Sequence, residues 1–462
     1  MAPIQPKAAP YRACTQIASL GDAIAVPVAA ADFPETRLRF RNDRWAAAVG
    51  LDDLSDEDWL RHFGRFDSLP DNLPQPLALR YHGHQFREYN PDIGDGRGFL
   101  FAQLLDGEDR LLDLATKGSG TTPYSRAGDG RLTLKGGVRE IMATEMLEAL
   151  GLETSKTFSL IETGEQLHRG DEPSPTRSAV LVRLGHGHIR IGSFQRAAFE
   201  RDDGFIERLA RYCLEHYYDE TDVADPGPAL LNKAVEACAR QAAHMVAAGF
   251  VHGVLNSDNI NISGESFDYG PWRFAPTWDP SFTAAYFDHA GLYAFGRQPE
   301  AIHWNLAQLA GCLRQIGEAP PLIAALERYP DLYREAFTAQ FLWRLGFASR
   351  GAEADHALVE AAEKALIASG VVADRFFFDW MGRPALDEPA YAADAFTAFR
   401  TAAAHYAPAR SRDHAYWNGN GPCSMHIEEV EAIWAHIADR DDWAPLHAKI
   451  DAIRSMGEAY RR

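Results

Sequence analysis

The sequence predicts an α+β fold of two lobes, β-rich in its N-terminal part and mainly helical in its C-terminal part. Three observations support this prediction. Short apolar strands gather before residue 190, one long helix is embedded among them, and helical periodicity dominates from about residue 200. We therefore expect two units, an N-terminal lobe over 1–190 and a helical lobe over 191–462.

The expected elements of the N-terminal lobe follow from local signals. An acidic segment around 52–63 predicts a short helix. Strands over 97–105 and 110–117 flank Asp106-Gly107, a dipeptide typical of hairpin turns. A helix over 133–150 should end at Gly151, and a further strand over 178–184 should follow a polar loop.

Helices account for most of the C-terminal lobe. The segment 229–248 has strong helical character and ends at Gly249. Further helices are expected within 301–370 and 390–405, and a final pair within 425–460. Strands followed by an embedded helix and then a helical half form the element order of a bilobal, protein-kinase-like fold.

Composition narrows the choice of partners and compartment. The chain has 462 residues, a formal charge of −19 and five scattered cysteines without a CxxC pair. Such a charge repels phosphate backbones, so we expect neither a nucleic-acid nor an anionic-membrane partner, although a local positive pocket could still bind one nucleotide. Without a secretory signal pattern or a long apolar run, we expect a reducing, cytoplasmic location.

The first chemical motif is glycine-rich and precedes the predicted hairpin. Gly94, Gly96 and Gly98 enclose Asp95 and Arg97, and Lys117 ends the second strand of the hairpin. Glycines let backbone N–H groups approach phosphate oxygens, and a lysine on a neighbouring strand can neutralise them. An ordinary glycine turn is the alternative interpretation.

A basic, glycine-rich segment follows from 117 to 139. It contains five basic residues and six glycines against a single acid, Asp129, in an otherwise acidic protein. Glycines among basic side chains before a helix N-terminus are typical of anion binding. Arg183 and Arg190 follow a strand and could both contact one polyphosphate, because guanidinium groups bind phosphate in a bidentate manner.

The third motif is HGVLNSDN at 252–259, followed by Asp268-Tyr269-Gly270. Kinase-like phosphotransferases use HxDxxxxN and a DFG-type aspartate, and here His252 and Asn259 have the required spacing. Val254 occupies the position of the usual catalytic aspartate and cannot accept a proton. Ordinary phosphoryl transfer with that base is therefore disfavoured.

A different acid, Asp258, precedes the metal-binding position Asn259. Aspartate and asparagine oxygens suit Mg²⁺ or Mn²⁺, which keep waters and bridge phosphates. A carboxylate beside such an ion can assist nucleophilic attack on phosphorus. The alternative is that Asp258 forms a turn through a local side-chain hydrogen bond.

Together these segments resemble the selenoprotein O (YdiU) family of pseudokinase-like protein adenylyltransferases. The resemblance spans about 80–310 in the order and spacing of that family. The matching stretches are GHQF at 83–86, GDGRG at 94–98, KGSGTTPYSRAGDGR at 117–131, HGVLNSDN at 252–259, DYGP at 268–271, and the FGRQP and WNLAQLA runs within 295–310.

The resemblance implies a set of site residues and a nucleotide whose α-phosphate faces the acceptor. Asp258 would be the general base, and Asn259 and Asp268 the metal ligands. Glu140 would pair with Lys117, although the helix pattern alone does not choose between Glu140 and Glu145. The implied nucleotide contacts are Gly94, Gly96, Arg97, Lys117, Asp129, Gly130, Arg183, Arg190 and Asp268.

The resulting hypothesis is a protein adenylyltransferase that uses ATP with Mg²⁺ or Mn²⁺. It would transfer AMP to Ser, Thr or Tyr hydroxyls of client proteins and release pyrophosphate. A kinase-like small-molecule phosphotransferase is one alternative, favoured by the His252 to Asn259 spacing and opposed by Val254. A non-catalytic nucleotide-binding scaffold is the other, favoured by the missing base and opposed by the two retained metal ligands.

Overall fold

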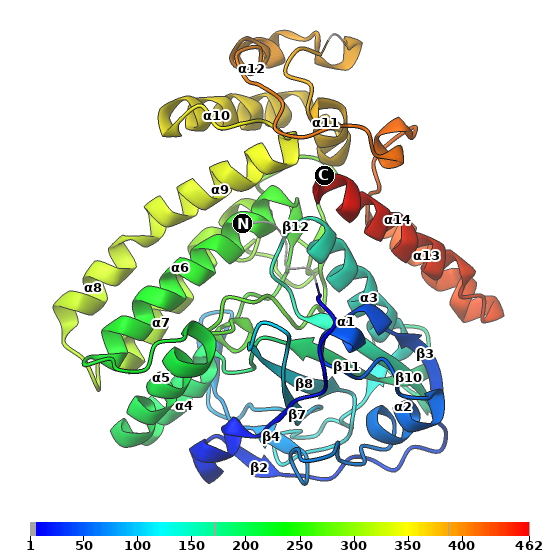
Figure 1. The fold of residues 1–462 in the computed structure, drawn as a ribbon, viewed down its shortest axis with the longest axis vertical. Coiled ribbons are helices and arrows are strands. Elements are labelled where there is room, and N and C mark those ends of the chain that lie inside the picture. Colours follow the sequence, from blue (N-terminus) through cyan, green and yellow to red (C-terminus); the bar gives the residue numbers. More distant parts are fainter. Residues whose placement is uncertain (1–5, 171, 387, 462) are drawn as a thin grey trace.

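The protein is a mixed α/β structure built around a curled antiparallel sheet (Figure 1). The computed structural model describes residues 6–170, 172–386 and 388–461. Within these ranges nine strands form the sheet in the order β2-β4-β7-β8-β11-β10-β3, with β1 beside β7 and β9 beside β11. The strands are β1 (Ala13–Cys14), β2 (Ala25–Pro27), β3 (Arg37–Arg41), β4 (Leu77–Leu79), β7 (Leu100–Leu105), β8 (Leu111–Lys117), β9 (Leu132–Thr133), β10 (Lys156–Leu167) and β11 (Thr176–Gly185).

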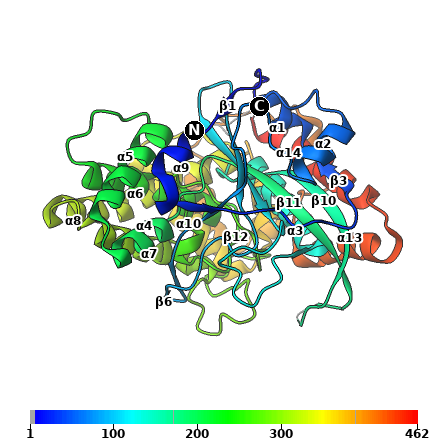
Figure 2. The same ribbon diagram turned by 90° about the horizontal axis from the view of Figure 1, so that it is seen from below.

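Both faces of the sheet are buried, and every residue of β11 except Arg177 is buried. Successive side chains of a strand point to opposite faces. Val180 and Val182 join an aromatic cluster that includes Trp59 of α2, whereas Leu181 joins the large core cluster that contains the apolar face of α3. The sheet is therefore the central layer, with α1 and α2 on one side and α3 on the other (Figure 2).

The β7–β8 hairpin confirms the predicted pair of strands. Its turn is held by the Asp106 carboxylate, which accepts hydrogen bonds from the backbone N–H groups of Glu108 and Arg110 at 2.9 and 3.0 Å. Asp109 adopts a left-handed conformation with a φ of 62°. The short polar side chain of aspartate tolerates this conformation better than most residues do.

The helix α3 also matches its prediction, with bounds Leu134–Ala149. Thr133 caps its N-terminus by accepting a hydrogen bond from the Gly136 N–H at 3.1 Å. Gly151 follows its C-terminus with a φ of 83°, a conformation that glycine adopts at little cost. The position of α3 on the sheet matters for the site described below.

Most other helices pack together beside the sheet, and Figure 1 shows α6 alongside α7 and α9. The confirmed long helix α6 ends before Gly249, whose φ is 73°. The helices besides α3 are α1 (Asp43–Ala48), α2 (Asp56–Phe63), α4 (Ile191–Glu200), α5 (Asp203–Tyr218), α6 (Pro226–Ala247), α7 (Gln298–Leu313), α8 (Ala319–Glu327), α9 (Tyr329–Leu345), α10 (Ala352–Ser369), α11 (Ala373–Trp380), α12 (Thr397–Ala403), α13 (Ile427–Arg440) and α14 (Ala444–Arg461).

Short elements complete the chain. Two small antiparallel pairs lie outside the main sheet, β5 (Gly83–Gln85) with β6 (Glu88–Asn90) and β12 (Phe250–Val251) with β13 (Arg273–Phe274). The 3-10 turns are η1 (Gln16–Ala23), η2 (Ser257–Asn259), η3 (Phe295–Arg297), η4 (Pro389–Tyr391), η5 (Asp394–Phe396) and η6 (Ala415–Asn418). Among the residues described, none of the helices has the length and apolar character needed to cross a membrane.

The last two helices return to the N-terminal half of the chain. Arg454 of α14 forms an ion pair with Glu145 of α3 at 2.6 Å, and Glu431 of α13 pairs with Lys135 at 2.8 Å. Asp441, which follows α13, pairs with Arg177 of β11 at 2.8 Å. Residues from the end of the chain therefore brace α3 and β11 of the sheet.

Two sequence expectations need correction. No strand was expected over 156–167, but this segment forms β10, which pairs with β11 on one side and β3 on the other. The helix expected over 390–405 is only partly helical, because α12 covers Thr397–Ala403 and 3-10 turns precede it.

Candidate active site

Strand register brings two cations to the same face of the sheet. Lys117 at the end of β8 stands opposite Leu181 of β11, so both side chains point to the α3 side. Arg183 lies two residues after Leu181 and therefore shares that face. The Lys117 ammonium lies 2.5 Å from Glu140 of α3, and both side chains are buried.

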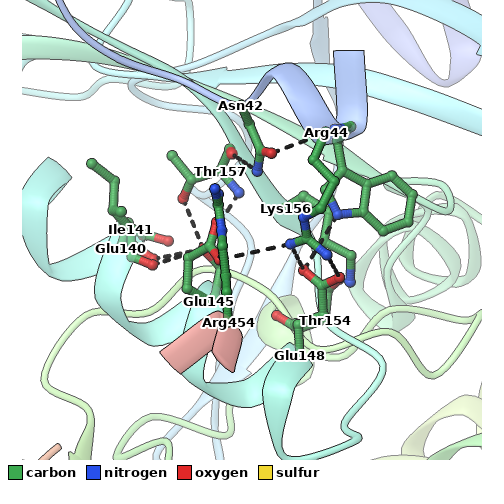
Figure 3. Close-up of polar contacts among 12 residues, drawn as sticks. Asn42, Arg44, Glu140, Ile141, Glu145, Glu148, Thr154, Lys156, Thr157 and Arg454 are labelled. Atoms are coloured by element: carbon green, nitrogen blue, oxygen red, sulfur yellow. Dashed lines mark hydrogen bonds and ion pairs between the residues drawn. The ribbon is translucent and has the colours of Figure 1, made fainter. Parts of the chain in front are cut away.

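Three buried carboxylates on α3 each have a different cation as their nearest partner. Figure 3 shows two of them, Glu145 and Glu148, near Arg44, which also lies 3.7 Å from Glu145. Glu140 binds Lys117, whereas Glu145 receives two hydrogen bonds from Arg454 at 2.6 and 2.9 Å. Glu148 receives two from Arg44 at 2.7 and 2.8 Å. The geometry thus places Glu140, and not Glu145, beside Lys117, and it uses Glu145 to hold α3 against α14.

Asp268 shares the Lys117 ammonium with Glu140. Its carboxylate lies 2.5 Å from the Lys117 nitrogen and 3.6 Å from a guanidinium nitrogen of Arg183. Burial disfavours its ionised form, but the charges of Lys117, Arg183 and Arg97 outweigh burial and hold the pKa of Asp268 well below its usual value. Asp268 is therefore a carboxylate at neutral pH.

The 252–259 loop is fixed by side chains on several elements. His252 contacts the Phe267 carbonyl through Nε2 at 3.0 Å and donates its backbone N–H to Gln298 at 3.0 Å. The Asn305 amide donates to the Leu255 carbonyl at 2.7 Å. These contacts explain why a loop whose only helical turn is η2 can present its side chains in one defined arrangement.

Asp258 occupies this loop with one carboxylate oxygen buried and without a hydrogen-bond partner among the described residues. Its side chain is near Gln85, and the residue is 8% exposed. Burial raises the pKa of Asp258 to about 6, although the charge of Arg190 acts in the opposite direction. Arg190 also donates to the backbone carbonyl of Asp258 at 3.1 Å.

Lys117, Asp258 and Asp268 line one cavity of about 630 Å³, together with Arg183 and Arg190. Cationic side chains outnumber carboxylates in its wall, so a positive pocket exists within a protein of charge −19. The Arg183 Nε and Nη1 atoms are buried and lack hydrogen-bond partners among the described residues. The charged lining residues are Asp95, Arg97, Lys117, Arg126, Asp129, Arg131, Arg169, Arg183, Arg190, Asp258 and Asp268.

Close packing explains the glycines of the 94–98 stretch. A Cβ atom on Gly94 would lie 2.5 Å from the Tyr124 ring, and one on Gly98 would lie 2.1 Å from the Thr116 carbonyl oxygen. Thr122 donates from its hydroxyl to the Asp95 carbonyl at 2.5 Å. The two glycine-rich segments are therefore packed on each other at the wall of the cavity, which larger side chains would prevent.

Comparison with known proteins identifies the family. The family model described as "Protein adenylyltransferase SelO" matches residues 9–454. The chain is 44% identical over 458 residues to a protein nucleotidyltransferase YdiU of Gloeobacter violaceus, covering 95% of this chain and 94% of that protein. It is 39% identical over 466 residues to a protein nucleotidyltransferase YdiU of Trichormus variabilis, covering 95% of each. This chain belongs to the protein adenylyltransferase SelO family.

Membership of the SelO family confirms the resemblance inferred from the motifs and the expected class of enzyme, a protein nucleotidyltransferase. A third relative, the protein nucleotidyltransferase YdiU of Synechocystis sp., is 47% identical over 338 residues, covering 72% of this chain and 70% of that protein. The family-model match over 9–454 includes every candidate site residue, since all of them lie between 94 and 268.

Most of the candidate site residues of this SelO family member line the same cavity. Glu140 is not among the lining residues of the cavity, but it forms an ion pair with Lys117, which is. Asn259 is not among the lining residues, and its amide nitrogen donates to the Val254 carbonyl at 2.9 Å. The candidates that line the cavity are Gly94, Gly96, Arg97, Lys117, Asp129, Gly130, Arg183, Arg190, Asp258 and Asp268.

The basic segment 117–139 contributes less than its composition indicates. Lys117, Arg126 and Arg131 line the cavity, but Arg131 also pairs with Glu165 at 2.8 Å. Lys135 instead pairs with Glu431 of α13, and Arg139 donates to the Trp272 carbonyl at 2.9 Å. Charge density along a segment could not predict which way each side chain points once α3 begins.

Sequence reasoning missed several lining residues. Asp95 forms an ion pair with Arg190 at 3.1 Å and so helps to hold that guanidinium. Tyr81 lies beneath it, with the Arg190 guanidinium carbon 4.3 Å from the ring centroid. Arg169 pairs with Asp129 at 2.8 Å from the loop after β10. Asp95 lies inside the glycine stretch and could have been found there, whereas Tyr81 and Arg169 carry no local signal.

The donor groups fit a hard divalent cation. Asp268 offers a carboxylate oxygen, and Asn259 offers an amide oxygen. No group of three or more His, Cys, Asp or Glu side chains arranged for a metal occurs in the described part of the chain. An ion here would complete its shell with waters and phosphate oxygens, which is how Mg²⁺ is usually bound with one or two carboxylates.

Proposed function

We propose that this chain transfers AMP from ATP to Ser, Thr or Tyr hydroxyls of client proteins and releases pyrophosphate. The observation that carries the proposal is the arrangement of opposite charges around one cavity. Asp258, one of whose carboxylate oxygens lacks a hydrogen-bond partner among the described residues, lines the same cavity as the phosphate-binding candidates Lys117, Arg183 and Arg190. Family membership supports the same activity.

In the proposed mechanism the client hydroxyl is the nucleophile and Asp258 is the general base. The hydroxyl oxygen forms a bond to the α-phosphorus while its proton passes to Asp258, and the bond from the α-phosphorus to the bridging oxygen of the β-phosphate breaks. Lys117, Arg183 and Arg190 would stabilise the negative charge on the phosphates. Asp258 is suited to this role because one of its carboxylate oxygens has no hydrogen-bond partner in the part of the chain that the structure describes.

Asn259 and Asp268 are the proposed ligands of Mg²⁺ or Mn²⁺. When bound, such an ion supplies charge neutralisation at the phosphates. Asp268 also contacts Lys117, so its carboxylate would have to serve the ion and the ammonium together. Asn259 would use its amide oxygen, because its amide nitrogen donates to the Val254 carbonyl.

We further propose that the architecture is a bilobal kinase-like fold divided near residue 190. The main sheet with α3 would form the nucleotide lobe over 1–190, and 191–462 the helical lobe that carries the 252–259 loop. The return of α13 and α14 to α3 would join the end of the chain to the first lobe. Five free cysteines agree with the reducing cytoplasm that we propose as its location.

One alternative function retains a specific supporting observation. The spacing from His252 to Asn259 and the anchored loop between them suit a phosphotransferase acting at the γ-phosphate. Val254 opposes this function, because a valine side chain cannot accept the proton of an acceptor. Incubating the enzyme and acceptor proteins with ATP labelled at the α- or the γ-phosphate tests the choice. Label from α-labelled ATP alone supports AMP transfer, and label from γ-labelled ATP alone supports the phosphotransferase.

A further inference from the structure

We propose that an exposed aromatic surface beside Asp258 docks an apolar segment of the client protein next to its acceptor hydroxyl. We call this the aromatic rim, formed by Tyr89, Phe199, Tyr286 and Phe287. Their exposed fractions are 36, 60, 80 and 42%, respectively. The inference rests on the proposed function, because it concerns the acceptor of that same site.

The hairpin of β5 and β6 connects the aromatic rim to the candidate base. The His84 N–H donates to the Ser257 hydroxyl at 2.7 Å, and the Phe86 N–H donates to the Asn256 side chain at 3.1 Å. A Cβ atom on Gly83 would lie 2.9 Å from a carboxylate oxygen of Asp258. The hairpin is therefore fixed directly on the 252–259 loop, and Gln85 of the same hairpin lines the cavity.

One half of the aromatic rim extends from the tip of this hairpin. The Phe86 ring contacts the rings of Tyr293 and Phe287, with centroid separations of 5.1 and 5.8 Å. The Phe287 ring contacts that of Tyr286 at 5.1 Å. Tyr293 returns to the 252–259 loop by donating its hydroxyl to Asn256 at 2.7 Å. These contacts form a continuous path of rings from the loop of Asp258 to the exposed Tyr286.

The segment that carries Tyr286 and Phe287 is internally braced. The Asp288 carboxylate accepts hydrogen bonds from the N–H groups of Leu292 and Tyr293, both at 2.8 Å. The Asp288 N–H donates to the Ala285 carbonyl at 3.1 Å. The two exposed rings are thus presented on a fixed turn. Presenting large rings in fixed positions toward water is typical of a binding surface, because it reduces the entropy lost on docking.

The other half of the aromatic rim lies at β6 of the hairpin and the end of α4. The Tyr89 ring contacts Phe199 at the end of α4 with centroids 5.8 Å apart. The Tyr89 hydroxyl is 2.7 Å from His82, which fixes its orientation. Figure 2 shows β6 beside α4 and α7. A client segment lying along the hairpin could therefore contact the rings near its tip and the rings near β6.

The charges next to the aromatic rim indicate what kind of segment it would accept. Arg87 at the hairpin tip pairs with Glu300 at 2.9 Å and lies over the Trp304 ring, with 5.4 Å from its guanidinium carbon to the centroid. Arg297 lies 3.5 Å from the same carboxylate. Arg87 and Arg297 share the single Glu300 carboxylate, which leaves one positive charge there, whereas the four side chains of the aromatic rim are themselves uncharged. An apolar client segment fits it better than an acidic or basic one.

Two synthetic serine peptides provide the test, one with leucines around the serine and one with asparagines. We expect the unmodified enzyme to label both peptides from α-labelled ATP, with a kcat/KM for the leucine peptide at least about tenfold higher than for the asparagine peptide. Differences of this size are typical when apolar contacts are filled. In the double variant Tyr286→Ser with Phe287→Ser, the ratio of the two kcat/KM values should fall close to one, mainly because KM for the leucine peptide rises. The affinity for ATP and the Tm should be unchanged, because both rings are exposed.

The double variant Ile323→Ser with Ile367→Ser is the matched control, since these side chains are 54 and 52% exposed on α8 and α10. It should retain the preference for the leucine peptide. Equal use of both peptides by the unmodified enzyme, or full preference in the Tyr286 and Phe287 variant, would overturn the docking proposal. Absence of α-label on every peptide and protein acceptor would instead overturn the proposed function.

Discussion

Arg190 donates a hydrogen bond from its guanidinium to the backbone carbonyl of Asp258, with 3.1 Å between nitrogen and oxygen. A second guanidinium nitrogen contacts the Asp95 carboxylate, also at 3.1 Å. Arg190 thus links the glycine stretch to the loop that carries the candidate base. A planar group with several donors can make both contacts while facing a phosphate, whereas an ammonium cannot.

Replacing Arg190 with lysine should therefore impair activity although the charge is kept. We expect Arg190→Lys to lower AMP transfer by about tenfold or more, because at least one charge-assisted contact is lost. The rate of α-label transfer at saturating ATP measures this effect, with the Tm as a control for folding. An unchanged rate would show that Arg190 does not position the loop.

Lys117 and Arg183 form the phosphate-binding part of the proposed site. Lys117→Ala or Arg183→Ala should weaken ATP binding by about 1.5–3 kcal/mol, the usual value of a hydrogen bond to a charged group. Isothermal titration calorimetry measures the affinity of each variant. Normal ATP affinity in both variants, with the fold intact, would contradict the assignment.

Glu140 and Glu145 should have different roles despite lying on the same helix. Glu140→Gln leaves Lys117 with Asp268 as its remaining carboxylate and should weaken ATP binding by about tenfold. Glu145→Gln removes the partner of Arg454 and should lower the free energy of unfolding by about 1–3 kcal/mol. Calorimetry and urea unfolding, applied to both variants, separate the two roles. The prediction fails if the two variants have the same effects.

Metal dependence follows from the oxygen donors near the phosphate-binding cations. Label transfer should require Mg²⁺ or Mn²⁺, and excess EDTA should abolish it until either ion is restored. Asp268→Ala should lower the rate strongly, because metal neutralisation of phosphate charge contributes several kcal/mol to the transition state. Asp32→Ala, at a fully exposed carboxylate, is the control and should have no effect. Undiminished transfer in EDTA would contradict the metal assignment.

Elements with strong local signals were predictable from the sequence. Thr133 and Gly151 bound α3 through a cap and a left-handed residue, and Asp106-Gly107 indicated the β7–β8 turn. β10 was missed because its sequence KTFSLIETGEQL contains polar residues throughout, as loops do. Its polar groups find partners only in the folded protein, where Glu162 receives two hydrogen bonds from Arg177 and one from Arg39.

The same distinction applies to the candidate site. The motifs identified site residues from their chemical type and their spacing along the chain. Most of these residues line one cavity. Partners supplied by distant segments had no local signal. Arg454 stands more than three hundred residues after Glu145, so the choice between Glu140 and Glu145 as the partner of Lys117 depended on a contact that no helix pattern contains. Tyr81 beneath Arg190 is a second example.

Asp258 is the residue on which the proposed mechanism depends most. The most direct measurement is the rate at which Asp258→Ala transfers label from α-labelled ATP to acceptor proteins, compared with the unmodified enzyme at equal ATP occupancy. We predict a fall of about 10²–10⁴-fold, the usual contribution of a general base, with ATP binding largely retained. Full activity in Asp258→Ala would contradict the mechanism and leave Asp258 as a residue that only shapes the 252–259 loop.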